Sequence, residues 1–95
     1  MHWYQRMKNQ DYATTLADCT VRFNNVFTFE YKGYKVITFS EENRGIGYII
    51  FLNDKYCRYR RYEYHFYKGP FNDYIKRFID DALGRKAKGL DSYGL

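Results

Sequence analysis

The most regular pattern of apolar and polar positions lies in the last third of the chain. Its apolar side chains recur at the three- and four-residue spacing of one helix face: Phe71, Tyr74, Ile75, Phe78, Ile79, Ala82 and Leu83. Pro70 suits a first helical turn, where its missing N–H is not needed, and Gly84 can cap the C-terminus. The spacing therefore predicts an amphipathic helix from Pro70 to Leu83.

The middle of the chain alternates apolar and polar residues, as strands with one buried face do. Lys32-Gly33 separates two such runs by two residues and predicts a tight hairpin. In that register Tyr31 faces Tyr34, Glu30 faces Lys35, Phe29 faces Val36 and Phe27 faces Thr38. The hairpin thus brings opposite charges together and apolar side chains together, which stabilises one register.

Ile46 to Leu52 is apolar on both faces and predicts a central strand, preceded by a polar connection from Glu41 to Gly45. Asn53-Asp54 then turns the chain into a further strand from Lys55 to Tyr67. Gly45 and Gly47 match no phosphate-binding loop, because no helix follows them, and indicate a flexible connection instead.

The N-terminal third carries a weaker pattern. Tyr12, Ala13, Leu16 and Ala17 predict a short helix that ends by Asp18. Cys19 to Phe23 alternates like a half-buried strand ending at the turn-forming pair Asn24-Asn25, and residues 1–8 form a short helix or an arm.

The fold predicted from these elements is α+β. It is an antiparallel meander of about four strands with the C-terminal amphipathic helix packed on one face, and with a possible short N-terminal helix. Residues 1–95 form a single domain in this prediction, with 1–8 a possible arm and 85–95 a mobile tail. Aromatic residues make up 22% of the chain, so large rings should build the core.

Composition bears on location and redox state. No apolar stretch is long enough to span a membrane and the first residues carry no apolar leader, so we expect a cytoplasmic protein without membrane contact. Cys19 and Cys57 lack CxxC spacing, which favours buried free thiols over a disulfide.

The formal charge of +5 is concentrated in one segment. Residues 1–54 carry six basic and six acidic residues, and residues 69–95 carry five and four. Between them, 55–68 holds five basic residues and Glu63 alone. Such asymmetry indicates an acidic partner.

The same segment interleaves cations with rings. Guanidinium groups bind phosphates and tyrosine rings stack on unpaired bases, a combination typical of single-stranded nucleic-acid binding. The candidate binding residues are Lys55, Arg58, Tyr59, Arg60, Arg61, Tyr62, Tyr64, His65 and Lys68. A second basic cluster, at Arg85, Lys86 and Lys88, either extends a phosphate-binding surface or is a solvated helix end.

Two arrangements of this strand are open. Strict alternation places Arg58, Arg60, Tyr62 and Tyr64 on one face and Tyr59, Arg61 and His65 on the other. A bulge at Arg60-Arg61 would instead leave Arg58, Glu63 and His65 outward, as in an edge strand whose charges prevent aggregation. The inward residues would then be Cys57, Tyr59, Tyr62, Tyr64 and Phe66. Alternating rings more often fill the buried face of a strand, as in this second arrangement, than stack on bases.

The sequence predicts no enzyme, cofactor or metal site. In an extended strand Cys57 and His65 would lie about 26 Å apart, too far for a nucleophile and its base. His2, Cys19, Cys57 and His65 lack the short spacings of a zinc site.

The predicted element order is similar, at the level of fold alone, to that of double-stranded RNA-binding domains. Their second helix has a lysine-rich start, which is replaced here by Gly69 to Asp73. In its Tyr-, Asn- and Lys-rich composition the chain also resembles phage accessory proteins, including anti-CRISPR inhibitors.

We therefore expect a small non-enzymatic binding protein whose basic, Tyr/Arg-rich strand contacts nucleic acid or a nucleic-acid-bound protein complex. The alternative is a phage-type inhibitor or adaptor that binds a host protein target. A third hypothesis is self-association through an exposed sheet edge, since the sequence leaves the oligomeric state open.

Overall fold

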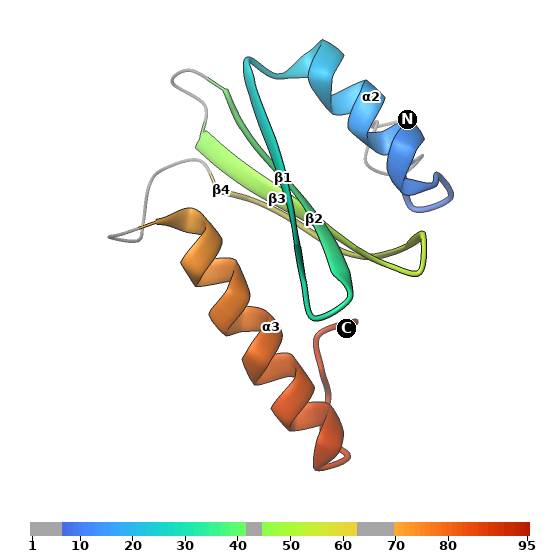
Figure 1. Cartoon of the computed structure of the whole chain (residues 1–95), viewed down its shortest axis with the longest axis vertical. Coiled ribbons are helices and arrows are strands. Elements are labelled where there is room, and N and C mark those ends of the chain that lie inside the picture. The colour runs from blue at the N-terminus through green and yellow to red at the C-terminus, as the bar shows by residue number, and fades with distance from the viewer. Residues whose placement is uncertain (1–6, 42–44, 63–69) are drawn as a thin grey trace. The chain divides into compact units, whose positions relative to one another are not determined.

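The structure is a computed structural model that describes residues 7–41, 45–62 and 70–95. The chain forms two compact units, Met1–His65 and Phe66–Leu95. The elements, drawn in Figure 1, are α2 (Tyr12–Arg22), β1 (Asn25–Tyr31), β2 (Tyr34–Glu41), β3 (Gly45–Leu52), β4 (Lys55–Tyr62) and α3 (Phe71–Ala87). The predicted α+β class, with its antiparallel meander and both helices, is confirmed.

The four strands lie in the order β1-β2-β3-β4, each antiparallel to its neighbours. The first hairpin has the predicted register, from Tyr31 opposite Tyr34 to Phe27 opposite Thr38. Both tight turns have positive φ at their two central residues: 51° and 85° at Lys32 and Gly33, and 50° and 65° at Asn53 and Asp54. That geometry matches the right-handed twist of the flanking strands, and both predicted turns are confirmed.

Helix α2 is longer than predicted. It continues to Arg22 and ends where the Phe23 N–H donates to the Cys19 carbonyl at 2.9 Å. The strand predicted for Cys19 to Phe23 is therefore wrong, and Val21, which that strand would have half buried, is 87% exposed. The reason is that Cys19 and Phe23 are one helical turn apart and extend the buried face begun by Thr15.

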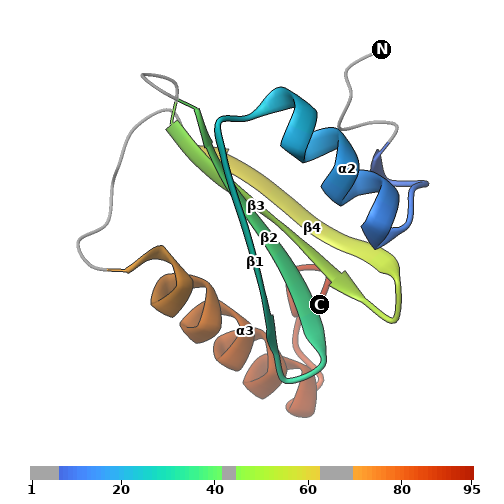
Figure 2. The ribbon, with the colours of Figure 1, turned by 45° about the horizontal axis from the view of Figure 1, so that its top comes forward.

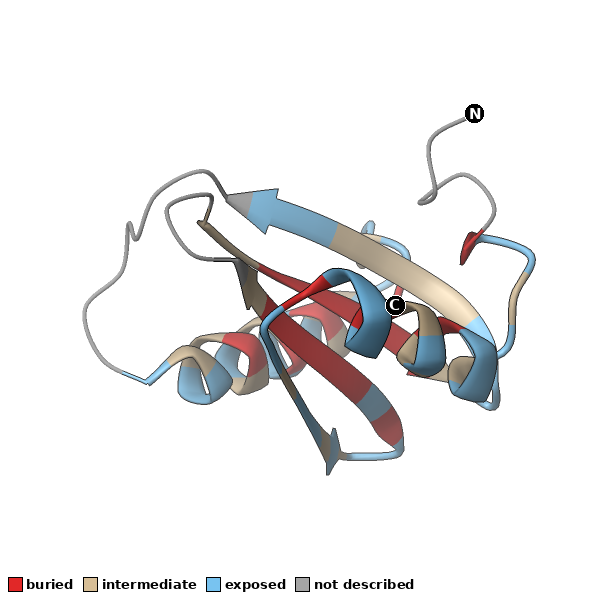
Figure 3. Ribbon diagram, turned by 90° about the horizontal axis from the view of Figure 1, so that it is seen from above, coloured by how far each residue is buried: buried red, intermediate tan, exposed pale blue. Residues whose placement is uncertain are grey.

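Helix α2 covers one face of the sheet (Figure 2). The core between them is a cluster of buried residues from α2, its flanks and the two central strands: Met7, Cys19, Phe23, Ile37, Phe39, Ile49 and Phe51. Buried positions concentrate on β2 and β3 (Figure 3), whereas Arg60 and Arg61 near the end of β4 are exposed. The prediction that rings build the core is met by Phe23, Phe39 and Phe51.

Strand β3 is the central strand that its apolar pattern predicts. Tyr48, Ile49, Ile50 and Phe51 are each at most 1% exposed, so both faces of the strand are buried. Gly45 and Gly47 belong to this strand, which corrects the prediction of a flexible connection there. The 42–44 part of that connection lies outside the described residues.

The second unit contains α3 and the residues that follow it. The helix begins after Pro70 as predicted but continues through Gly84 to Ala87. Gly84 does not have the positive φ of a glycine that ends a helix, and the first glycine after the helix that has it is Gly89 (φ 74°). Arg85 to Ala87 are thus helical and not part of a tail. Packing of this helix on the sheet stays a prediction.

Residues 88–95 fold back along α3. The Tyr93 ring lies 5.3 Å from that of Phe78, and the Arg85 Nε donates to the Asp91 carbonyl at 2.6 Å. These contacts place the segment along the C-terminal half of α3, and the mobility predicted for the tail stays a prediction.

Candidate nucleic-acid interface

Strand β4 is an edge strand that contains a bulge. Ile50 is opposite Arg58 and Phe51 is opposite Tyr56, so Cys57 is the extra residue that the β3–β4 register skips. The predicted bulge at Arg60-Arg61 is therefore wrong, since these two residues pair regularly with Tyr48 and Gly47. The bulge brings Tyr56 and Tyr59, three residues apart, onto the same face of the sheet.

Tyr56 and Tyr59 are structural residues. Both are half-buried and pack against the core cluster under α2. The Tyr56 ring makes an edge contact with Phe51 at 6.5 Å, and the Tyr59 ring is parallel to that of Phe39 at 6.2 Å. Burial raises the pKa of the Tyr56 hydroxyl. These rings support the sheet and are not presented for base stacking.

The arginines of β4 follow the strict alternation that was one of the two predicted arrangements. Arg58 and Arg60 share the face of Tyr48 and Ile50, and Arg61 lies on the face of α2. Arg58 is half-buried, and its Nε donates to the hydroxyl oxygen of buried Tyr48 at 3.0 Å. That hydrogen bond holds the Arg58 guanidinium against the sheet.

Arg60 and Arg61 are the exposed arginines of the strand. The Arg60 Nη1 donates to the carbonyl of its neighbour Tyr59 at 3.3 Å. The Arg61 guanidinium lies 5.8 Å from the centre of the Phe23 ring, which itself stacks on Phe39 at 4.2 Å. The two charges therefore point to opposite sides of one edge.

Together these cations define the β4 cationic edge, which consists of Lys55, Arg58, Arg60 and Arg61. The eight residues of β4 include no carboxylate, so its formal charge is +4. Lys55 is exposed at the start of the strand. Of the other predicted binding residues, Tyr62 ends β4, and Tyr64, His65 and Lys68 lie outside the described residues.

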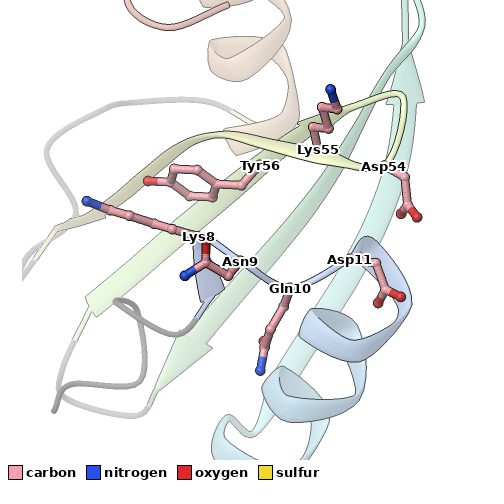
Figure 4. A pocket seen from close by; sticks show the side chains of 7 residues that line it. All are labelled: Lys8, Asn9, Gln10, Asp11, Asp54, Lys55 and Tyr56. Carbon is pink, nitrogen blue, oxygen red and sulfur yellow. The ribbon is translucent and has the colours of Figure 1, made fainter.

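An open pocket of about 410 Å³ lies beside Lys55, where the segment before α2 approaches the turn between β3 and β4 (Figure 4). Sequence reasoning missed it. Its lining residues are Lys8, Asn9, Gln10, Asp11, Asp54, Lys55 and Tyr56. No signal in the sequence connects Asp54 with this helix, because the hydrogen bond between them joins residues 42 positions apart.

The two aspartates of the pocket bind backbone N–H groups of α2. Asp11 accepts from Thr14 N at 2.8 Å and Asp54 accepts from Tyr12 N at 2.9 Å. Hydrogen bonding from the Thr14 side chain, followed by that from its backbone N–H, lowers the pKa of the exposed Asp11 carboxyl. Both carboxylates thus satisfy helix N–H groups that have no partner within the helix.

The second basic cluster lies at the C-terminal end of α3 and contacts the residues that follow the helix. The Arg85 guanidinium stacks 5.1 Å from the Tyr93 ring centre, and the Lys86 Nζ donates to the Leu95 carbonyl at 3.2 Å. Lys88 is exposed at the C-cap. Cations here suit the negative end of the helix dipole.

The two cysteines are free thiols in different surroundings. Cys19 is fully buried, and burial, followed by the nearby Asp18 charge, raises its pKa from 9.0 to about 12. Cys57 is half-buried at the bulge, where its Sγ contacts the Lys55 carbonyl at 3.5 Å. Only the thiolate is a strong nucleophile, so the two thiols should differ in reactivity.

We expect a thiol reagent at pH 8 to label Cys57 at least about 100-fold faster than Cys19 in the native protein. Labelling rates followed by mass spectrometry, with Cys57→Ser isolating Cys19, measure the difference. Because the folded Cys19 pKa is raised, its contribution to stability is complete below pH 9 and is lost as the pH rises towards 12. Equal rates in the native protein would contradict the burial of Cys19.

Neither a metal site nor a membrane-spanning helix occurs in the described part of the chain. Across residues 7–41, 45–62 and 70–95, no three His, Cys, Asp or Glu side chains gather closely enough to hold a metal ion. Within the same ranges, no helix has the length and apolar character needed to cross a bilayer.

The features that remain for a binding function are the β4 cationic edge and the pocket at its Lys55 end. Comparisons with protein-family models, curated proteins and solved structures found no match for this chain.

Proposed function

We propose that the β4 cationic edge binds the phosphate backbone of nucleic acid. The observation that supports this most is the +4 formal charge within one eight-residue edge strand without a carboxylate. Such a row of cations attracts a polyanion and releases its condensed counterions on binding.

The spacing of the cations suits a backbone contact. At the rise of a strand, Lys55 and Arg61 lie about 20 Å apart, a length that covers several consecutive phosphates. The edge position leaves one side of β4 without a neighbouring strand in the described sheet. Arg60 and Arg61, which are exposed on opposite faces, can bracket the backbone between them.

The inward packing of Tyr56 and Tyr59 narrows the proposal. With Tyr56 and Tyr59 packed inward, the β4 cationic edge contacts nucleic acid through its cations, and contacts to phosphates carry no sequence information. We therefore propose binding with little sequence preference, to the phosphates of free nucleic acid or of a nucleoprotein complex alike.

We expect replacement of Arg60 and Arg61 by Gln to weaken binding of a fluorescent oligonucleotide, measured by anisotropy over a series of salt concentrations. Each phosphate contact contributes about −0.9 to the slope of log K against log salt for duplex DNA, so the double variant should lose up to about 1.8 of slope. Single- and double-stranded probes are compared in the same series.

The matched control is Lys32→Gln with Lys35→Gln, which removes the same charge from the β1–β2 hairpin, separated from β4 by β3. Equal weakening by both double variants would mean that net charge, and not the β4 edge, attracts the probe. Absence of salt-sensitive binding in the parent protein would overturn the proposal and turn the search to a protein partner.

A further inference from the structure

The two edges of the sheet differ in character. Strand β1 reads Asn-Val-Phe-Thr-Phe-Glu-Tyr and contains neither lysine nor proline, the residues that commonly protect an edge strand. Its single charge, Glu30, is opposite Lys35 on β2. The charges on β4 repel a second copy of that strand, whereas β1 has no such protection.

The hydrogen-bonding groups of β1 follow from its hairpin. In a two-residue hairpin the residues that flank the turn, Tyr31 and Tyr34, exchange both backbone hydrogen bonds, and every second residue repeats this. The N–H and C=O groups of Val26, Thr28 and Glu30 therefore point away from β2. Within the described sheet, β1 pairs with β2 alone.

Strand β1 also carries apolar side chains at this exposed edge. Phe27 is 65% exposed, the most exposed ring among the large apolar residues described. It shares a face with Phe29, two residues along the strand. The five residues Val26 to Glu30 are nearly symmetric about Thr28, with a phenylalanine on each side.

We infer that β1 pairs antiparallel with β1 of a second copy of this chain, about a two-fold axis at Thr28. In this register Val26 lies opposite Glu30 of the partner subunit, and Thr28 lies opposite Thr28 of the partner subunit. All three outward-pointing residues then form hydrogen-bonded pairs. A register centred on Val26 or on Glu30 would leave some of these three residues without a partner from the other copy.

The same register also pairs rings and avoids repulsion. Phe27 lies opposite Phe29 of the partner subunit, and aromatic pairs across strands are stabilising. The two Glu30 carboxylates are placed at opposite ends of the pairing. A two-fold axis perpendicular to the sheet keeps both α2 helices on one face, and the core cluster of α2 is centred on β2 and β3, away from the joined edges. The two four-stranded sheets become one of eight strands.

The test is sedimentation velocity on nuclease-treated protein from micromolar to millimolar concentration. The mass should rise from the 11.6 kDa of one chain to twice that value and stop there. Thr28→Lys should abolish the rise, because two lysines would meet at the axis while the exposed position leaves the monomer intact. Thr20→Lys, at an exposed position on α2, is the matched control and should dimerise as the parent does.

A charge exchange makes the test specific. Thr28→Glu should also stay monomeric, and a mixture of the T28K and T28E variants should restore the double mass, because opposite charges then meet at the axis. A monomeric parent at all concentrations, an unchanged dimer in T28K, or a mass that rises beyond two chains would each overturn the inference. These masses are measured without nucleic acid, so they are independent of the proposed function.

Discussion

Replacement of Gly47 by Ala is expected to destabilise the protein by about 3 kcal/mol, the upper part of the range for overpacked positions. A Cβ at this position would lie 2.5 Å from Phe39 Cζ and 2.7 Å from the Arg60 carbonyl oxygen. The carbonyl belongs to the neighbouring strand and cannot move without disturbing the β3–β4 pairing. Urea denaturation followed by far-UV circular dichroism measures the change in the free energy of unfolding.

Gly84→Ala is the matched control because it adds the same methyl group. Nothing lies within 4 Å of the added Cβ, and Gly84 is inside α3. Alanine has the higher helix propensity, so this variant should be more stable by about 0.5–1 kcal/mol. A Gly47→Ala protein as stable as the parent would contradict the close approach of Phe39 to β3.

Replacement of Phe39 by Ala is expected to cost about 3–5 kcal/mol, as for other fully buried phenylalanines. The Phe39 ring is 2% exposed and lies between the rings of Phe23 and Tyr59, at 4.2 and 6.2 Å. Its removal leaves a cavity at the centre of the core under α2. The same urea titration measures this loss.

Phe27→Ala removes an equal ring from the neighbouring strand and controls for chemistry. Phe27 is 65% exposed, so in dilute monomeric protein its replacement should change stability by less than about 0.5 kcal/mol. Similar losses for the two variants would contradict the assignment of Phe39 to the core and of Phe27 to the exposed edge.

The sequence was most informative where one local signal decided the structure. Lys32-Gly33 specified a turn, the turn specified the register, and cross-strand pairs such as Glu30 with Lys35 agreed with it. The run from Ile46 to Leu52 was apolar on both faces, which only a central strand can bury on a sheet of this kind.

The sequence was misleading where the same residues fit both the two-residue period of a strand and the 3.6-residue period of a helix. Cys19 and Phe23 fit both an alternating strand and the next turn of a helix. The position that would have decided between them, Thr15, is polar in sequence yet fully buried. Its hydroxyl donates to the Asp11 carbonyl at 2.9 Å, so a threonine takes an apolar position without an unsatisfied group.

The candidate site was predictable in charge but not in orientation. The excess of cations in β4 can be counted in the sequence, whereas the roles of Tyr56 and Tyr59 depend on the bulge at Cys57. A bulge is set by the partner strand and by the core that the side chains must reach, and neither is visible in the residues of β4 alone. For the same reason, Asp54 could not be connected with α2, which precedes it by more than thirty residues.

The bulge at Cys57 also gives β4 one place at which its length can change. Since the β3–β4 register skips Cys57, its deletion would leave each remaining residue of β4 opposite the same residue of β3 as before. Deletion of a residue that the register pairs, such as Tyr59, would instead move the side chains of part of the strand to the opposite face of the sheet. Over evolutionary time, loss of one residue can thus be accepted at this position while the core and the cations keep their sides.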